Sequence, residues 1–325
     1  MTISVIGCGY WGKNLIRNFY ELGELSSVCD YSNALASQFG SKYQVPALSF
    51  EEVLLSDCRG VVIALPAFLH AEYAIKALEA GKHVYVEKPL AMNIEDANKM
   101  IAASNKSNKK LMVGHLLQYH PIFCKIKMML NDGIVGDINY LYSNRLSLGK
   151  VRSEENVLWS FAPHDISMIL SLANSGIKDI YCHSSSKLQY DVADNIVCNI
   201  NFNNGIQAHI FCSWMNPFKE HKLVLMGSKG MIVFDDTKQW NEKLCIYNHN
   251  FDITKSPPVF KKEDPSYILV KEKEPLKEEC KHFIDVVNKE IQPLTCAEEG
   301  KRVLNVLSMA SDSIIAKEVI KCQVN

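Results

Sequence analysis

A glycine-rich loop near the N-terminus constrains the fold of this chain more than any other feature. The segment Gly7-Cys8-Gly9-Tyr10-Trp11-Gly12 follows an apolar run, Ile3–Ile6, and opens a segment of helical period. In a strand–loop–helix unit the first glycine makes a tight turn, the second lets the backbone approach a pyrophosphate, and the third lets the helix pack on the strand. The loop therefore predicts a dinucleotide site, although the pattern alone also fits a plain strand–turn–helix. The predicted cofactor-binding residues of the loop are Gly7, Gly9, Tyr10, Trp11 and Gly12.

An acidic residue after the second apolar run supports the dinucleotide interpretation. Asp30 follows Leu25–Cys29 and stands eighteen residues after Gly12, where a carboxylate accepts hydrogen bonds from an adenosine ribose. Such a carboxylate also repels a 2′-phosphate, and the segment Tyr31–Asn33 contains no arginine to bind one. We therefore expect NAD rather than NADP, with Ser32 also in the site. The alternative is that Asp30 only caps a helix.

The first part of the chain, to about residue 115, alternates short apolar runs with segments of helical period. That alternation is typical of βαβ units and predicts an α/β domain with a doubly wound parallel sheet. The predicted strands are Ile3–Ile6, Leu25–Cys29, Val61–Leu65, Val84–Val86 and Leu111–Val113, and the predicted helices are Gly12–Leu22, Asn33–Phe39, Phe50–Ser56, Leu69–Ala80 and Ile94–Ser104.

After Pro121 the pattern changes to longer β-rich runs. Turn pairs such as Asn204-Gly205 and Lys229-Gly230 separate several of them, which favours an α+β domain with a large, mostly antiparallel sheet. The predicted strands are Ile138–Leu148, Ile177–Lys187, Ile196–Phe202, Ile206–Trp214, Lys222–Met226, Met231–Phe234 and Leu244–Tyr247, and the predicted helices are Ile122–Asn131, Ala162–Ala173, Pro275–Lys289 and Ala297–Lys317. We expect the last two helices to cover this sheet and the charge-dense segment Lys261–Glu279 to be a solvated loop that leads to a helix.

Composition excludes several classes of function. Thirty-five basic and 36 acidic residues give a formal net charge of −1, so the chain lacks the one-signed field that a nucleic-acid binder uses. The longest uncharged apolar stretch, Gly60–Leu69, contains Pro66 and is shorter than the ~18 residues that span a bilayer. No basic segment precedes the first apolar run, so we expect no secretory signal and a cytoplasmic protein.

The cysteines and histidines show no metal-binding pattern. The 11 cysteines are widely spaced, and a chain of this length does not need disulfides for stability, so we expect all of them to be reduced. No Cys-x-x-Cys or His-x-x-x-His pair occurs among these residues. We therefore expect no bound metal.

Three further features carry a family resemblance. They are Ala64-Leu65-Pro66-Ala67-Phe68-Leu69-His70, then Gly81-Lys82-His83-Val84-Tyr85-Val86-Glu87-Lys88-Pro89, and His164. With the glycine loop they resemble the glucose-fructose oxidoreductase and inositol dehydrogenase family, often called Gfo/Idh/MocA, whose most specific mark is the Glu-Lys-Pro triplet. The resemblance implies a nicotinamide-dependent oxidoreductase of a sugar or polyol. It also implies an NAD-binding Rossmann domain over residues 1–120, a substrate-binding and oligomerisation domain over 121–325, and a homodimer or homotetramer.

Lys88 is predicted to be catalytic. It lies at the carboxyl end of a predicted parallel strand, where such sheets bind ligands. An ammonium group beside a bound alcohol can donate a hydrogen bond and stabilise a developing alkoxide, and Pro89 restricts the backbone that positions it. The residues predicted to line the cofactor on this side are Ala64, Pro66, His70, Glu87 and Lys88. Glu87 is expected to orient its neighbours, and His70 could equally cap the helix that it precedes.

His164 is the second predicted catalytic residue, because it stands where the family commonly has the histidine of Asp-x-Gly-x-His. An imidazole suits removal of a hydroxyl proton while hydride leaves the same carbon. Ser160 replaces the acidic residue that the family usually has four positions earlier, and Asp165 is a poor substitute for it. We therefore expect Lys88 and His164 to act as a pair, with Ser160 at most a polar contact. The alternative is that His164 only contacts substrate.

Four short segments resemble the branch of the family that acts on nucleotide-linked sugars: Asn144–Arg152, Glu155–Trp159, Ser213–Lys219 and Gly227–Gly230. Their positive side chains Arg145, Arg152 and Lys219 could bind a diphosphate, although charges on strand surfaces are often only solvated. The predicted substrate-binding residues are Lys88, Arg145, Arg152, Asn156, Trp159, Ser160 and His164.

Within that branch the resemblance is strongest to the 3-dehydrogenases of UDP-N-acetylglucosamine. It implies hydride transfer from the sugar 3-hydroxyl to NAD, giving a 3-keto sugar that a pyridoxal-phosphate aminotransferase would then aminate for lipid A or another surface glycan. Alternative substrates are a UDP-uronic acid, a dTDP-deoxysugar, or free inositol or glucose. A non-catalytic NAD-binding sensor is an alternative of another class, and the presence of both Lys88 and His164 argues against it.

Overall fold

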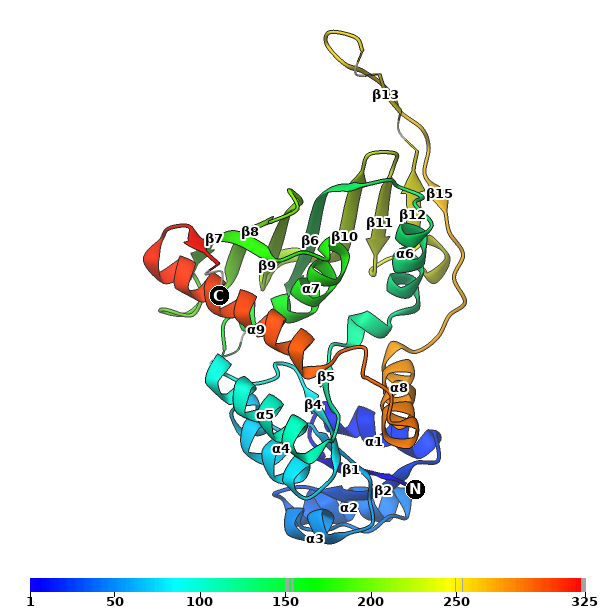
Figure 1. The fold of residues 1–325 in the computed structure, drawn as a ribbon, viewed down its shortest axis with the longest axis vertical. Helices are drawn as coiled ribbons and strands as arrows, with labels where there is room; N and C mark the ends of the chain where they lie inside the picture. The colour runs from blue at the N-terminus through cyan, green and yellow to red at the C-terminus, as the bar shows by residue number, and fades with distance from the viewer. Residues whose placement is uncertain (150–151, 153–154, 249, 253, 323–325) are drawn as a thin grey trace. The chain divides into compact units, whose positions relative to one another are not determined.

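A computed structural model describes residues 1–149, 152, 155–248, 250–252 and 254–322. The chain forms two compact units, each made of two segments (Figure 1). The first unit contains Met1–Tyr119 and Lys273–Asn305, and the second contains His120–Glu272 and Val306–Asn325.

The first unit is built on a five-stranded parallel sheet in the order β2-β1-β3-β4-β5. This order confirms the predicted doubly wound sheet, and almost every strand residue is buried, as expected when helices cover both faces. The strands are β1 (Ile3–Ile6), β2 (Leu25–Cys29), β3 (Gly60–Ile63), β4 (His83–Glu87) and β5 (Leu111–Gly114).

Three of the helices between these strands begin at residues whose side chains cap them. Ser32 accepts a hydrogen bond from the backbone N–H of Leu35, and Ser49 with Glu52 forms a reciprocal capping box. The helices are α1 (Gly12–Glu21), α2 (Asn33–Tyr43), α3 (Phe50–Leu55), α4 (His70–Glu79) and α5 (Ile94–Ser107), with short 3₁₀ turns η1 (Ala67–Leu69) and η2 (Leu116–Tyr119).

Helix α8 (Pro275–Lys289) also belongs to the first unit, so the expectation that it covers the antiparallel sheet is wrong. Its apolar side packs on the parallel sheet, where the Phe283 ring lies 5.6 Å from that of Tyr85 and 6.3 Å from that of Phe19. A Cβ on Gly60 would lie 3.1 Å from the Phe283 ring. The glycine at the start of β3 thus leaves room for the aromatic anchor of α8.

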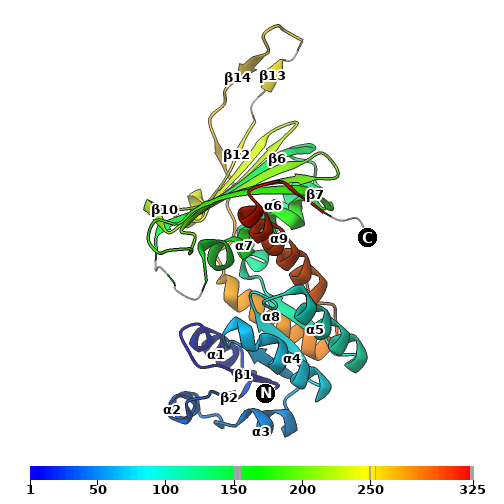
Figure 2. The ribbon, with the colours of Figure 1, turned by 90° about the vertical axis from the view of Figure 1, so that its left-hand side faces the viewer.

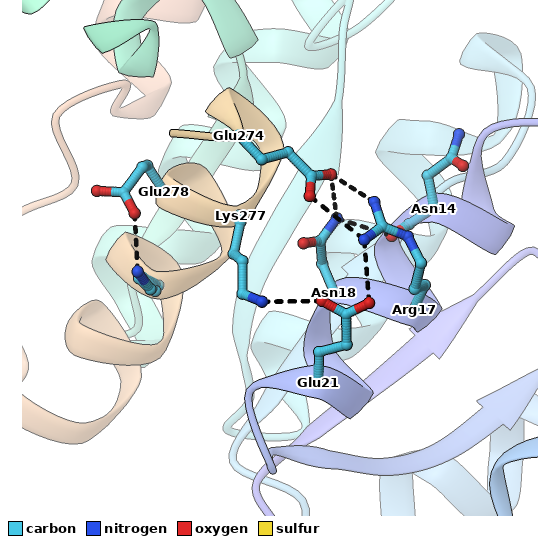
Figure 3. Close-up of polar contacts among 8 residues, drawn as sticks. Asn14, Arg17, Asn18, Glu21, Glu274, Lys277 and Glu278 are labelled. Carbon is cyan, nitrogen blue, oxygen red and sulfur yellow. Dashed lines mark hydrogen bonds and ion pairs between the residues drawn. The ribbon is translucent and has the colours of Figure 1, made fainter. Parts of the chain in front are cut away.

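The polar side of α8 is joined to α1 by ion pairs (Figure 3). The Arg17 guanidinium pairs with Glu274 and, at 3.1 Å, with Glu21. Lys277 donates to the other Glu21 oxygen at 2.8 Å, and the Asn18 amide donates to Glu274 at 3.1 Å. These contacts fix the start of α8 beside the helix that follows the glycine loop.

The second unit is built on a nine-stranded sheet in the order β15-β12-β11-β10-β6-β9-β8-β7-β16. Only the β6–β9 pair is parallel among the described pairings, which confirms a mostly antiparallel sheet. The strands are β6 (Ile138–Leu148), β7 (Ile177–Ser185), β8 (Asn195–Phe202), β9 (Gln207–Ser213), β10 (Met215–Gly227), β11 (Met231–Asp235), β12 (Leu244–Tyr247), β15 (Ser266–Tyr267) and β16 (Ile320–Lys321). A separate hairpin pairs β13 (Asn250–Asp252) with β14 (Val259–Lys261).

Helices α6 (Pro121–Asn131) and α7 (Val157–Ala173) lie on one face of this sheet (Figure 2). Helix α7 begins five residues before the predicted Ala162, because Asn156 caps it and Pro163 is accommodated inside it. Helix α9 (Ala297–Ala316) runs from the first unit into the second. In the second unit its Ser311 and Ser313 side chains bond to the Trp159 indole N–H and the Cys182 backbone N–H.

The expectation that all the cysteines are reduced is wrong. Cys182 and Cys198 form a disulfide, because antiparallel β7 and β8 place them directly opposite each other with Cα atoms 4.2 Å apart. The segment Lys261–Glu279 leads into α8 as predicted, but it also contains the short strand β15, which was not predicted. Within the described residues, none of the helices combines the length and the apolar character that crossing a bilayer requires.

Candidate active site

The glycine loop has the geometry that a dinucleotide site requires. A Cβ on Gly7, whose φ is +97°, would lie 2.4 Å from the Ala64 carbonyl oxygen, and a Cβ on Gly12 would lie 1.8 Å from the Gly7 carbonyl oxygen. Side chains are therefore excluded at both positions. A Cβ on Gly9 would meet nothing within 4 Å, so this part of the loop is open to a ligand.

The start of α1 is suited to an anion. Its N-cap residue, Trp11, makes no side-chain capping bond, and the first turn contains no acidic residue. Backbone N–H groups at such a helix start carry partial positive charge. The loop and the helix start together fit the pyrophosphate of NAD.

Asp30 holds the loop from the end of β2. One carboxylate oxygen accepts the Cys8 backbone N–H at 2.7 Å, and the other accepts the Ser32 backbone N–H at 2.8 Å. A carboxylate has about four acceptor positions, so both oxygens retain capacity for ribose hydroxyls. Ser32 itself is exposed and caps α2.

His70 joins the loops that follow β3 and β4. Its Nδ1 lies 2.8 Å from the Pro89 carbonyl oxygen and its Nε2 lies 2.9 Å from the Leu65 carbonyl oxygen. Burial lowers the pKa of His70, while the two carbonyl groups act in the opposite direction. With a side chain only 1% exposed, His70 fixes the loop that carries half-buried Ala64 and exposed Pro66. Its contact with a cofactor stays a prediction.

Glu87 connects the Glu-Lys-Pro triplet to the glycine loop. Its Oε1 accepts the Trp11 indole N–H at 2.6 Å and the Tyr85 hydroxyl at 3.1 Å, and its Oε2 accepts the Lys88 backbone N–H at 3.3 Å. Burial raises the pKa of Glu87, whereas these donors and the Lys88 charge lower it. Sequence reasoning placed Trp11 beside the cofactor but missed this bond, which no local spacing indicates.

In the second unit, His164 lies on α7 next to a buried ion pair. Asp165 is 1% exposed and Arg145 is 12% exposed. The Asp165 carboxylate accepts bonds from the Arg145 guanidinium and from the Ser143 hydroxyl. These contacts attach α7 to β6 and fix the residue that follows His164. The Arg145 guanidinium is thus engaged in an ion pair with Asp165, and the role of Arg145 as a substrate ligand stays a prediction.

The other predicted substrate residues also make structural contacts. Arg152 is exposed and pairs with Glu155, and the Asn156 side chain accepts the Trp159 backbone N–H at 3.2 Å. Ser160 is 5% exposed, whereas Lys219 on β10 is exposed. Lys150 and Val151, in the segment that resembles the nucleotide-sugar branch, lie outside the described residues.

The two predicted catalytic residues belong to different units. Lys88 is half-buried at the end of β4, and His164 is half-buried on α7. Each is placed by its own unit, and their action as a pair stays a prediction.

Comparison with known proteins identifies the family. Residues 1–115 match the oxidoreductase family with an NAD-binding Rossmann fold, and residues 123–233 match the GFO/IDH/MocA C-terminal domain. The chain belongs to the Gfo/Idh/MocA family. It is therefore an oxidoreductase with NAD as its cofactor, and the resemblance identified from the sequence is confirmed.

Several members of this family are similar over much of the chain. An uncharacterised oxidoreductase of Streptococcus pneumoniae is 28% identical over 71% of this chain and 67% of its own length. The UDP-N-acetylglucosamine 3-dehydrogenase of Acidithiobacillus ferrooxidans is 26% identical over 66% of this chain and 67% of its own. A crystal structure of that enzyme matches with a TM-score of 0.86 at 22% identity, covering 97% of this chain and 98% of that one. GenD2 from gentamicin A biosynthesis, solved with NAD, matches with a TM-score of 0.83 at 17% identity, covering 100% and 97%.

Replacing Asp30 with alanine is expected to weaken NAD binding at least about tenfold. The substitution removes two bonds that hold the loop and the acceptor for the ribose, and a bond to a charged group contributes about 1.5–3 kcal/mol. Calorimetric titration measures the dissociation constant. Asp57→Ala, at an exposed position of the same unit, is the control, and an Asp30→Ala affinity equal to that of the control would contradict the assignment.

Proposed function

We propose that this oxidoreductase transfers hydride from a nucleotide-linked sugar to NAD. The best candidate is the 3-hydroxyl of UDP-N-acetylglucosamine, whose oxidation gives a 3-keto sugar for a later transamination. The observation that carries the proposal is the position of Lys88, a cation at the carboxyl end of β4 whose neighbour Glu87 is bonded to the cofactor loop.

The residues of the first unit supply binding and electrostatics for this reaction. NAD, when bound, is the hydride acceptor. The Lys88 ammonium group donates a hydrogen bond to the reacting hydroxyl and stabilises negative charge that develops on its oxygen. The Glu87 carboxylate, held by Trp11 and Tyr85, accepts the backbone N–H of Lys88 and so orients that residue.

His164 is the proposed base of the second unit. Oxidation of an alcohol releases one proton, and an imidazole can accept it as hydride leaves the same carbon. Buried Ser160 stands one helical turn before His164 and supplies no carboxylate. The support for His164 is instead the adjacent residue Asp165, which its bonds to Arg145 and Ser143 immobilise.

The choice of a nucleotide-linked substrate rests on charge and on relatives. The exposed side chains of Lys219 and Arg152 offer positive charge for a diphosphate in the second unit. One guanidinium group can bind two phosphate oxygens at the same time. A relative that is 26% identical is named as a 3-dehydrogenase of UDP-N-acetylglucosamine. We propose the same substrate class here, with an aminotransferase as the pathway partner that consumes the ketone.

We also propose that the protein is a homodimer or homotetramer joined through the nine-stranded sheet. Helices cover one face of that sheet. On β7 and β8, Tyr181 and Val197 point to one side and are 39% and 37% exposed, although both are large and apolar. Light scattering should show an oligomer that Val197→Glu dissociates, and a monomeric native protein would refute this interface.

The substrate is tested by NADH absorbance with a panel of UDP- and dTDP-hexoses, UDP-uronic acids, free glucose and inositol. An aminotransferase with glutamate is added in parallel to remove any ketone. We expect a signal with UDP-N-acetylglucosamine that increases when the ketone is removed. A signal only with free inositol or glucose would refute the nucleotide-sugar proposal, and no signal with any sugar would refute the activity proposed here.

Replacing Lys88 with methionine is expected to lower kcat at least about a hundredfold, because the positive charge at the reacting oxygen is lost. NAD affinity should change little, since methionine retains the length of the side chain and the loop is held by other residues. Stopped-flow NADH formation and calorimetry measure the two quantities. Lys42→Met, at an exposed position of α2, is the matched control, and equal kcat values for the two variants would contradict the role of Lys88.

A further inference from the structure

Glu279 is a buried acid with no evident structural partner. It lies on α8, its side chain is 1% exposed, and neither carboxyl oxygen has a hydrogen-bond partner among the described residues. Its neighbours on the helix differ, because Glu274 and Glu278 form ion pairs (Figure 3). Burial of an unpaired carboxylate is costly enough that such groups usually take up a proton.

The charge of Glu87 disfavours the ionised form of Glu279, whereas a hydrogen bond from Tyr85 would favour it. The titratable neighbours that couple to it are Tyr85 and Glu87 on β4, Tyr119 on η2 and Cys280 on α8. All four are acids, so each is neutral or negative. Burial raises the pKa of both Tyr85 and Tyr119, so both hydroxyl groups keep their protons.

Glu87 and Glu279 form a pair of carboxyl groups in which one proton is strongly favoured. Like charges in a buried site cannot both ionise cheaply. Glu87 accepts bonds from three donors, on Trp11, Tyr85 and Lys88, whereas Glu279 accepts none. The negative charge therefore belongs on Glu87 and the proton on Glu279. Consistent with this, burial and the Glu87 charge raise the pKa of Glu279 well above its usual range.

The Tyr85 hydroxyl distinguishes the two carboxyl groups further. A phenol has one hydrogen to donate, and Tyr85 donates it to Glu87 at 3.1 Å. Towards Glu279 the hydroxyl can then only accept. A protonated Glu279 can donate to it, whereas an ionised Glu279 would meet only lone pairs.

We propose that Glu279 is a positioning residue that carries a proton in the native protein and thereby lets Glu87 remain ionised beside Lys88. The proton on Glu279 removes the like charge that would otherwise drive a proton onto Glu87. An ionised Glu87 then keeps its bonds to the indole of Trp11 and to the backbone of Lys88. The consequence for Lys88 rests on the proposed function, whereas the proton on Glu279 does not.

The proton has a measurable effect on stability. An acid whose pKa is raised by folding binds more protons in the folded state than in the unfolded state, so stability falls as pH rises above the unfolded pKa. For one proton the folding equilibrium constant falls about tenfold per pH unit, from the ordinary glutamate range up to the raised pKa of Glu279. Glu279→Gln is neutral at every pH and removes this loss.

The first experiment compares thermal midpoints of the native protein, Glu279→Gln and the matched control Glu278→Gln across a pH series. Glu278 is on the same helix, and the pKa of Glu278 is lowered by its lysine partners. We expect Glu279→Gln to gain stability relative to the native protein as pH rises, and Glu278→Gln to show no such gain. A pH-independent difference between Glu279→Gln and the native protein would overturn the proposal.

Infrared spectroscopy gives a readout that remains valid if the variant folds poorly. The native protein at neutral pH should show the carbonyl band of a protonated carboxyl group, and Glu279→Gln should lack it. Absence of that band from the native protein would overturn the proposal.

The pH profile of NADH formation tests the coupling to Glu87. The loss of activity at alkaline pH should move to higher pH in Glu279→Gln, and an unmoved profile would refute the coupling. Absence of turnover with every sugar would count against the proposed function alone.

Discussion

The hydrogen bond between the Trp11 indole and the Glu87 carboxylate is the contact on which the first unit's site depends. It joins the glycine loop after β1 to the Glu-Lys-Pro triplet after β4, two segments that are 76 residues apart in sequence. The carboxylate fits there because a Cβ on Gly114 would lie 2.9 Å from Glu87 Oε2. The parallel sheet brings these strand ends to one edge, and Glu87 makes them a single site.

A comparable anchor supports the second unit. Asp165 and Arg145 form a buried ion pair, which costs desolvation and is retained only with good hydrogen-bond geometry. Ser143 completes the acceptor set of Asp165. Because Asp165 follows His164 directly, the pair fixes the turn of α7 that carries the predicted base. Ser160 replaces the acidic residue that the family usually has four positions before the histidine. The ion pair between Arg145 and Asp165 attaches α7 to β6 instead.

The parts of the fold with short-range signals could be predicted from the sequence. The parallel sheet and the glycine loop were predicted because apolar runs, helical periods and glycines at fixed spacing are local features. The position of α8 in the first unit was not predicted, because the pattern of its apolar residues does not indicate which sheet Phe283 contacts. The Cys182–Cys198 disulfide and the Arg145–Asp165 pair depend on strand register, and the bond from Trp11 to Glu87 depends on tertiary proximity. No spacing in the sequence encodes these three contacts.

The coupling of the cofactor loop to Lys88 through Glu87 is tested most directly by a double-mutant cycle. Trp11→Phe removes the indole donor and Glu87→Gln removes the charged acceptor, and kcat/KM for NADH formation is measured for both single variants and for the double variant. If the bond joins the two segments functionally, the effects are not additive, and the coupling energy exceeds about 1 kcal/mol. Additive effects, to within about 0.3–0.5 kcal/mol, would show that the loop and Lys88 act independently and would contradict the central role of Glu87.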